Sequence, residues 1–509
     1  MTAYAADGPA SPGESFPILE YRVLGNSVLP IRAVERAVYP HLGPMRSISD
    51  AQAARLDLEK AYRDAGFSTV YVDIPEQSVE DGIVRLRVTE GRVERVRVTG
   101  ARYVSNRRII ADVPALQKDQ VPHFPSVQKQ LADVNRESND LKVVPVLRPG
   151  SAPGTVDVDL KANDTLPLHA SAELNNRYTV GTTHTRVYFN LAYDNLFQSF
   201  QSLAVQYQMA PERPKDSGVL AATYTAPLGP PGASLTVLGV GTDSNVATLG
   251  TLGVLGKGHI YGAHYSLPLP SSASFYPSLT FGADFKDFEQ NVLLSQGAGL
   301  ETPIRYVNWS GVFAGTYLRP KFNASFDIDL NFGIRGLVNE SAEFENNRYL
   351  AKPNYTYLRV NGTAEQTLLW GTRLSLRLSS QYTTEPLISN EQFAIGGVDS
   401  ARGYLEAQEL GDMGVSGSLE LRSPALGSIF GSRPQQAYLF VFGDAAVIGV
   451  IDALPQQEGR LHLGSWGVGF RVASLSGFDA ALDWAYPLVN TADVRAGDTR
   501  LDFRFRYGF

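Results

Sequence analysis

The spacing of apolar residues divides the chain into two parts. Up to about residue 160, stretches in which apolar residues recur every three or four positions alternate with stretches in which they recur every second position. This mixture is typical of small domains built from helices and strands. After Asp164-Thr165-Leu166-Pro167 the helical period disappears, and alternation of apolar and polar residues continues to the C-terminus. We therefore predict an α+β region followed by an all-β region.

The first module of the α+β region has the predicted order β-α-α-β-β. Its expected elements are a strand over 16–23, helices over 31–41 and 50–64, and strands over 68–72 and 82–88. Ser49 and Asp50 are suited to cap the second helix, and Gly66 is suited to end it.

The same order then recurs, which indicates an internal repeat. The second set comprises a strand over 93–98, helices over 106–112 and 125–141, and strands over 142–147 and 154–160. We place the two modules at 16–91 and 92–164, after an N-terminal extension of residues 1–15. Ala3-Tyr4-Ala5 in this extension has the small-x-small form that precedes signal cleavage. The extension is either a remnant of a signal peptide or an accidental run of alanines.

The last segment of the chain shows the strand alternation most clearly. One face carries Leu501, Phe503, Phe505, Tyr507 and Phe509, and the other carries Asp502, Arg504, Arg506 and Gly508. Residues 186–194 and 478–486 show the same alternation. Apolar residues on one face and polar residues on the other are the pattern of a transmembrane β-strand, with lipid outside and an aqueous lumen inside.

We count sixteen such segments, an even number, as expected when both ends of a barrel lie on one side of the membrane. They begin near residues 169, 184, 201, 217, 233, 256, 274, 303, 321, 354, 372, 414, 435, 461, 477 and 500. The predicted fold is therefore two small α+β domains followed by a 16-stranded antiparallel transmembrane β-barrel over 165–509. A soluble β-sandwich is the alternative, but no separate core elements are visible to cover a second face.

One long connection interrupts the alternation, at about residues 385–413. Its centre, Phe393 to Tyr404, contains the pair Gly396-Gly397 and ends in Arg402-Gly403-Tyr404. Glycine adopts backbone angles closed to other residues, so Gly403 can form a sharp tip. Long connections belong to the outer side of such barrels. We expect this loop to carry a function.

Composition excludes several classes of protein. No run of 18 apolar residues is present, so no transmembrane helix is expected. The net charge of -7 argues against nucleic acid as a partner. The chain has no cysteine, and its seven histidines are scattered without metal-ligand spacing. We predict no catalytic residues, no metal, no cofactor and no enzymatic activity.

Several short sequence motifs resemble those of one known protein family. Tyr62-Arg63-Asp64-Ala65-Gly66-Phe67 and Val88-Thr89-Glu90-Gly91 are similar to POTRA domains. Two such modules before a sixteen-stranded barrel resemble the transporters of two-partner secretion, the hemolysin secretion and activation proteins. Further similar phrases are 146–150, 154–158, 173–177 and 193–197. The resemblance implies an outer-membrane protein with periplasmic POTRA domains, which secretes a large β-rich partner protein.

The resemblance also assigns roles within the long loop. In that family the loop between strands eleven and twelve folds back into the barrel with a (V/I)RG(Y/F) tip, and here the tip is Ala401-Arg402-Gly403-Tyr404. The arginine is implied to pair with the acid of an F/G-x-D-x-G motif on strand thirteen. The matching stretch runs from Phe442 through Asp444 to Ala446, with Ala446 in place of the motif's glycine.

Physical chemistry independently favours an ion pair at the loop tip. An arginine inside a barrel is costly unless it is paired, and its planar guanidinium suits a carboxylate. Asp444 is the first candidate and Glu420, on strand twelve, is the second. An exposed loop with a solvated Arg402 is the alternative.

The sequence also suggests which residues contact the secreted protein, the barrel-assembly machinery and lipid. An exposed sheet edge can capture an extended chain by adding a strand, and we select Val70-Tyr71-Val72 and Val143-Val144 as candidate edges. The end of the chain, Phe505, Tyr507 and Phe509, resembles the signal read by the barrel-assembly machinery. Outer-membrane lipid is expected around the barrel.

Two other functions remain open. An outer-membrane insertase or assembly factor shares this architecture, although usually with more POTRA domains, and a passive porin would leave the first 160 or so residues without a purpose. We expect either that the protein has no plug helix or that such a helix was lost with a missing start of the chain. In either case the inward-folded loop would be the main obstruction of the pore.

Overall fold

The structure is a computed structural model of the full chain. It describes residues 15–79, 81–243, 246–249, 252–255, 257–289, 291–293, 299–427, 434–474 and 477–509. The chain forms two compact units, Met1–Leu166 and Pro167–Phe509. Among the described residues, no helix is both long and apolar enough to cross a membrane.

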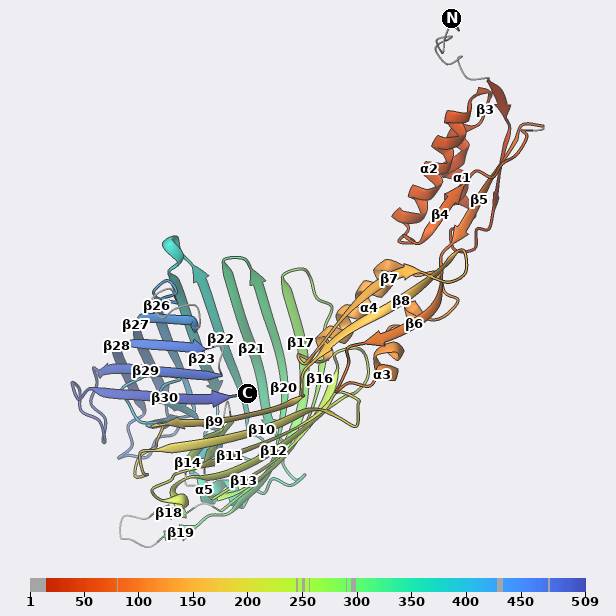
Figure 1. Cartoon of the computed structure of the whole chain (residues 1–509). Coiled ribbons are helices and arrows are strands. Elements are labelled where there is room, and N and C mark those ends of the chain that lie inside the picture. The colour runs from red at the N-terminus through yellow and green to blue at the C-terminus, as the bar shows by residue number, and fades with distance from the viewer. Residues whose placement is uncertain are drawn as a thin grey trace, which may run out of the picture. The chain divides into compact units, whose positions relative to one another are not determined.

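The first module of the N-terminal unit packs two helices on a three-stranded sheet (Figure 1). Its elements are β1 Phe16–Ile18, β2 Glu20–Leu24, α1 Ile31–Val38, η1 Tyr39–His41, β3 Gly43–Arg46, α2 Ile48–Asp64, β4 Val70–Asp73 and β5 Ile83–Glu90. The sheet order is β2-β5-β4, with β2 parallel and β4 antiparallel to β5. Leu58 and Tyr62 of α2 are fully buried against this sheet, because they lie one helical turn apart on its apolar face.

The second module repeats this arrangement. Its elements are β6 Arg92–Thr99, α3 Asn106–Ala111, η2 Pro114–Leu116, α4 Phe124–Glu137, β7 Leu141–Pro149 and β8 Thr155–Asp164. The sheet order is β6-β8-β7, again with one parallel and one antiparallel pair.

Three details of the sequence prediction for these modules are wrong. Helix α2 is capped by Ser47 rather than Ser49, because the Asp50 carboxylate accepts the Ser47 amide at 2.8 Å and forms a capping box with it. Strand β3 was not predicted, and it pairs with β1 outside the main sheet. Helix α4 ends at Glu137, because Leu141 already begins β7.

A buried carboxylate joins the two modules. Glu90, the last residue of β5, accepts hydrogen bonds from the Ser27 and Val28 amides at 2.5 and 3.0 Å and pairs with Arg92 at 2.9 Å. Burial opposes its ionisation, but the hydrogen bonds from Ser27 and Val28 outweigh that effect and lower the pKa of Glu90. In the second module, hydrogen bonds from Ser151 and Thr155 lower the pKa of the half-buried Glu94 to about 2.

The C-terminal unit is a closed antiparallel barrel of sixteen strands. The strands are β9 Leu168–Asn175, β10 Arg186–Leu196, β11 Gln201–Met209, β12 Gly218–Pro227, β13 Ser234–Thr242, β16 Lys257–Pro268, β17 Phe275–Glu289, β20 Ile304–Arg319, β21 Phe322–Gly333, β22 Thr356–Thr367, β23 Arg373–Thr383, β26 Met413–Arg422, β27 Pro434–Gly449, β28 Arg460–Ser474, β29 Phe478–Pro487 and β30 Arg500–Gly508. Each begins within two residues of its predicted start. The predicted fold class is confirmed.

Short elements lie in the connections between barrel strands. They are η3 Pro214–Asp216, β14 Val246–Leu249, β15 Leu252–Leu255, β18 Asn291–Leu293, β19 Gly299–Glu301, α5 Ser341–Asn347, η4 Leu369–Gly371, η5 Ser389–Glu391, β24 Phe393–Ile395 and β25 Glu409–Gly411. The last two pair with each other inside the long loop.

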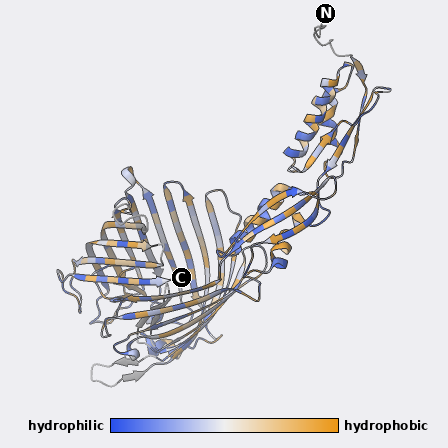
Figure 2. Ribbon diagram, viewed as in Figure 1, coloured by the Kyte–Doolittle hydropathy of each residue, from blue (hydrophilic) through white to orange (hydrophobic). Residues whose placement is uncertain are grey.

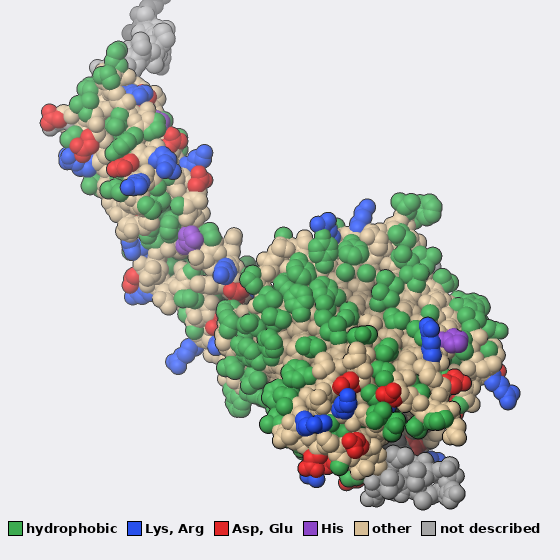
Figure 3. Space-filling view, turned by 180° about the vertical axis from the view of Figure 1, so that it is seen from behind, with side chains coloured by type: hydrophobic (Ala, Val, Ile, Leu, Met, Phe, Trp, Pro, Cys, Tyr) green, Lys and Arg blue, Asp and Glu red, His purple; other side chains and the backbone are tan. Residues whose placement is uncertain are grey.

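Hydrophobic and hydrophilic residues alternate along the strands of the barrel (Figure 2). Figure 3 shows hydrophobic side chains gathered on the outside of the wall. On β30, for example, Leu501 and Tyr507 are exposed on this face, whereas Asp502 is buried inside. A lipid-facing exterior accounts for this pattern.

Ring closure between the last and first strands is the shortest ladder of the barrel. β30 and β9 pair over five residues, from Arg504↔Asn175 to Gly508↔Ser171. Phe509 and Ala170 exchange two further backbone hydrogen bonds at one end. At the other end the Asn176 amide side chain donates to the Leu501 carbonyl and accepts from the Phe503 amide, both at 2.8 Å. One side chain therefore continues the ladder where the backbone of β9 leaves it.

Candidate functional site

The long loop between β23 and β26, the eleventh and twelfth barrel strands, spans residues 384–412. Gly396 and Gly397 follow β24 with φ of +105° and +93°, in the region that favours glycine. A Cβ on Gly396 would lie 2.5 Å from Gln408 Cβ, and a Cβ on Gly397 would collide with the Glu406 carboxylate. These glycines let the two arms of the loop approach each other closely.

Arg402 lies at the tip and is 1% exposed. Its Nε donates to Asp444 Oδ2 and its Nη2 to Asp444 Oδ1, each at 2.8 Å, and its backbone amide also donates to Oδ2 at 3.0 Å. Nη1 donates to Glu420 Oε1 and Nη2 to Ser418 Oγ, both at 2.8 Å. The geometry thus brings Arg402 to both candidate acids, Glu420 on β26 and Asp444 on β27. The pair with Asp444 is bidentate, which is the strongest form of such a pair.

Aromatic and apolar side chains surround this ion pair. The Arg402 guanidinium lies 3.5 Å from the centre of the Phe442 ring, a cation–π arrangement. Ala401 is fully buried in a cluster that includes Ile395 and Ala446. The two residues that depart from the family pattern, Ala401 and Ala446, therefore pack in one apolar cluster.

Tyr404 fixes the other side of the tip. It is fully buried, and its hydroxyl lies 2.9 Å from the Gly464 carbonyl and accepts the Val489 amide at 3.0 Å. Gly403 has φ of +90°, and a Cβ there would lie 3.3 Å from Ala485 Cβ. Glycine therefore allows Arg402 and Tyr404 to reach different strands of the wall.

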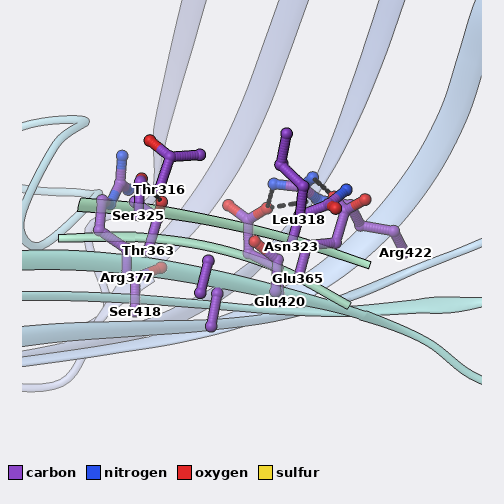
Figure 4. Close-up of a pocket in the computed structure, with 13 residues that line it drawn as sticks. Thr316, Leu318, Asn323, Ser325, Thr363, Glu365, Arg377, Ser418, Glu420 and Arg422 are labelled. Atoms are coloured by element: carbon purple, nitrogen blue, oxygen red, sulfur yellow. Dashed lines mark hydrogen bonds and ion pairs between the residues drawn. The ribbon is translucent and has the colours of Figure 1, made fainter. Parts of the chain in front are cut away.

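A chain of charges continues from the tip along the inner wall. Arg422 donates to Glu420 Oε2 at 2.8 Å and to Glu365 Oε2 at 2.6 Å, and Glu365 also accepts from Arg373 at 3.3 Å. Figure 4 shows Glu365, Glu420 and Arg422 linked in this way, beside a cavity of about 420 Å³. Ser325, Thr363, Ser418 and Arg377 are among the other residues that line this cavity.

A second ionic contact holds the loop beside its tip. Arg177, which follows β9, donates to Glu406 Oε1 at 2.9 Å and to Asp399. Arg377 of β23 also pairs with Asp399, at 3.4 Å. Sequence reasoning did not identify these contacts, because Arg177 and Glu406 are separated by 229 positions in the chain.

The base of the loop contains two further buried carboxylates that the sequence did not reveal. Asp412 is fully buried and accepts two hydrogen bonds from Arg348, at 2.9 and 2.8 Å. Glu391 is 2% exposed and accepts from Lys286 at 2.5 Å and from Tyr306 at 2.6 Å. Their partners lie in other strands and loops, so no local motif marks them.

The remaining predicted residues lie at free edges and strand ends. Strands β4 and β7 are edge strands of their sheets. Tyr71 and Val144 are exposed, whereas the neighbouring residues Val70, Val72 and Val143 are buried. Phe505, Tyr507 and Phe509 are exposed on the outer wall.

Comparison with known proteins agrees with this architecture. The model of the haemolysin secretion/activation protein family ShlB/FhaC/HecB matches residues 154–472, and the model of the ShlB-type POTRA domain matches residues 16–91. The outer membrane transporter CdiB of Dickeya dadantii (strain 3937) is 23% identical over 185 residues, a match that covers 36% of this chain and 32% of that relative.

Solved structures share the fold at low identity. CdiB from Escherichia coli aligns over 100% of this chain and 93% of its own, with a TM-score of 0.64 and 17% identity. BamA from Haemophilus ducreyi lacking POTRA domains 1–3 aligns over 97% and 100%, with a TM-score of 0.59 and 16% identity. The family match extends over more than half of the chain and includes the loop and both of its candidate acids. The chain therefore belongs to the haemolysin secretion/activation protein family ShlB/FhaC/HecB.

Proposed function

We propose that this protein carries one large, β-rich secreted partner protein across the outer membrane. As a member of its family, it resides in the outer membrane, with its POTRA domains in the periplasm. The observation that carries the proposal is a closed barrel with a polar inner wall, which a loop enters and contacts through ion pairs, hydrogen bonds and apolar packing. Such a loop can block the lumen and still be displaced.

The tip of the loop acts as the gate of this pore. Arg402 is held by Asp444, Glu420 and Ser418, so the closed position is defined by several hydrogen bonds to one side chain. Opening requires that these bonds be replaced by others or by water. No chemical energy source is needed in the protein if the partner folds outside the cell and thereby draws the rest of its chain outwards.

The POTRA domains recognise the partner before it enters the barrel. The free edges of β4 and β7 offer unpaired backbone groups to an extended chain. Exposed Tyr71 and Val144 supply side-chain contacts at these edges. During biogenesis the C-terminal residues Phe505, Tyr507 and Phe509 contact the barrel-assembly machinery, and afterwards they face outer-membrane lipid.

Deletion of the gene tests the proposal directly. Quantitative proteomics of the culture medium should show the loss of one large protein, with the rest of the secreted proteins unchanged. Complementation with the native gene should restore it, and complementation with Arg402→Ala should restore much less. In planar bilayers the Arg402→Ala protein should conduct more than the native protein. Unchanged secretion together with unchanged conductance would remove the gating role of the loop.

An outer-membrane insertase is the second candidate function, and the fold likeness to BamA favours it. The same deletion separates the two functions. Loss of an insertase would lower the amounts of several outer-membrane barrels, whereas loss of a secretion pore would leave the outer-membrane proteins unchanged.

A further inference from the structure

Three arginines converge on one carboxylate of the loop, Asp399. Arg177 pairs with its Oδ2, and Arg377 lies 3.4 Å from its Oδ1. Arg504 of β30 lines the same cavity, of about 220 Å³, and its charge also acts on Asp399. These cations come from three separate parts of the barrel wall, namely the end of β9, β23 and β30.

Asp399 differs from the tip in its access to solvent. Its side chain is 62% exposed, whereas Arg402 and Asp444 have side-chain exposures of 1% and 0%. The charged groups around Asp399 can therefore exchange partners with a group in the lumen, and those at the tip cannot until the loop moves. Arg177 also keeps its pair with Glu406 if Asp399 leaves, so it remains in position.

Two of these arginines have hydrogen-bond donors that are not used by any described residue. Within the described residues, the Nε of Arg377 is buried without a hydrogen-bond partner, and Arg504 has no ion pair.

Arg377 also lines the larger cavity of Figure 4, together with Glu365 and Arg422. Arg422 is the last residue of β26 and Arg373 the first of β23, the strand ends on the same side as the start of β9, where the chain leaves the N-terminal unit. A polypeptide that enters the barrel at these strand ends meets Arg422 and this cavity, which Ser418 and Glu420, two partners of Arg402, also line.

We propose that Arg177, Arg377 and Arg504 form a receptor site for acidic side chains of the entering polypeptide, and that Asp399 occupies this site in the closed state. An Asp or Glu of the entering chain replaces Asp399, which releases the loop on this side and exposes the tip to displacement. The inference rests on the proposed function, because it assumes that a polypeptide enters the lumen.

The charge balance of the site favours an acidic ligand. The other carboxylates that line this cavity, Glu420, Asp483 and Asp502, already pair with arginines of their own, so a basic segment would find no unpaired acid among them. A carboxylate would instead meet Arg504, which has no ion pair in the described part of the chain, together with Arg377. An extended chain with several acidic residues binds better than a free carboxylate, because each bound residue raises the local concentration of the next.

The test uses the full-length protein in planar bilayers, with synthetic peptides added on the POTRA side. Hexaglutamate should raise the open probability, whereas hexalysine, hexaserine and free glutamate at the same carboxylate concentration should not. Arg504→Gln should raise the half-maximal hexaglutamate concentration roughly fivefold, as expected for one accessible ion pair. Arg506→Gln is the matched control, because Arg506 lies on the same face of β30 but lines neither cavity.

Variants at Asp399 complete the test. Asp399→Asn should raise the open probability without peptide, and Asp399→Glu should keep the pore closed. Heat-modifiable migration on gels identifies any variant whose barrel has not folded. The site is overturned if hexaglutamate has no effect on the native protein, if free glutamate is equally potent, or if Arg504→Gln and Arg506→Gln behave alike.

These results are separable from the proposed function. If the protein responds to hexaglutamate but its deletion leaves the culture medium unchanged, the receptor site is supported and the role in secretion is contradicted. If the protein is needed for secretion but does not respond to hexaglutamate, the role in secretion is supported and the receptor site is contradicted.

Discussion

The loop is held to the barrel wall by two ionic contacts with the same chemistry and opposite surroundings. At the tip, Arg402 and Asp444 are fully enclosed. Beside the tip, Asp399 pairs with Arg177 and Arg377 while most of its side chain is open to the lumen. The difference lies in burial rather than in the groups involved.

Burial decides what each contact can do. An enclosed ion pair is held by geometry, because loss of either partner leaves the other charge without water or counter-charge. An accessible pair contributes less, since water and salt compete with it. A gate built from both kinds has one contact that fixes the closed position and another that can respond to the contents of the lumen.

The largest expected effect comes from removing the enclosed acid. Asp444→Asn leaves the buried Arg402 with Glu420 as its remaining counter-charge, and breaking one side of a buried pair costs about 3–5 kcal/mol. The loop should leave its docked position, which would appear as a higher single-channel conductance and as faster hydrogen exchange of the amides of residues 402–404. Asp479→Asn on β29 is the control and should change neither quantity, since Asp479 lies in register with Ala473 and Arg506, away from the residues that hold the tip. Native-like exchange in Asp444→Asn would contradict the importance of this pair.

Removal of the second acid at the tip should have a smaller effect. Glu420→Gln leaves all three hydrogen bonds from Arg402 to Asp444 in place, so the expected cost is about 2 kcal/mol, as for one hydrogen bond to a charged group. The Asp444→Asn, Glu420→Gln double variant should fall short of the sum of the two single effects, because both acids share Arg402. A strictly additive result in the hydrogen-exchange rates would show that the two acids act independently.

The accessible contact should respond weakly to mutation and strongly to salt. Asp399→Asn is expected to cost about 0.2–1 kcal/mol, in the range of exposed ion pairs. The open probability of the native pore should rise with ionic strength, and that of Asp399→Asn should rise less, because one screened interaction is already missing. An equal salt response in the two proteins would place the salt-sensitive contact elsewhere.

The smallest expected effect is the contribution of Glu90 to the stability of the N-terminal unit. Glu90 is a buried carboxylate of the periplasmic modules, so it can be compared with the buried pair at the tip. Its pKa is lowered in the folded state, so its stabilising contribution is present above the usual glutamate pKa of about 4.3 and is lost as the pH falls through the lowered value. Calorimetry of the full chain should therefore show that the N-terminal unit of the native protein loses stability below about pH 4. Glu90→Gln should be less stable at pH 7 and should lose less on acidification. A parallel loss in both proteins would assign the acid sensitivity to other groups.

The sequence predicted those features that repeat locally. Alternation along each strand is set by the two faces of the wall, so all sixteen strand starts could be found without contacts between strands. The place of the loop followed from the same count. Arg402 and Asp444 could be suggested as partners because both lie in short recognisable phrases.

The other anchors of the loop could not be predicted for a physical reason. Arg177 and Glu406, or Arg348 and Asp412, become neighbours only when the ring of strands closes and the loop folds inwards. Neither their own spacing nor their local composition differs from that of solvated charges. The Ser47 cap was missed for the opposite reason, because Ser47 and Ser49 are equally suitable by type and only the backbone geometry separates them.

The Asn176 side chain has a consequence for how the barrel is made. It bonds to Leu501 and so joins residues 325 positions apart, whereas every other ladder of the ring can form between strands that follow each other along the chain. Contacts of such long separation carry the greatest loop-closure entropy and form late. A side chain that can bond to the last strand before the full ladder is in register would favour the final step of folding, so substitution of Asn176 should delay the appearance of the closed barrel more than it weakens the finished one.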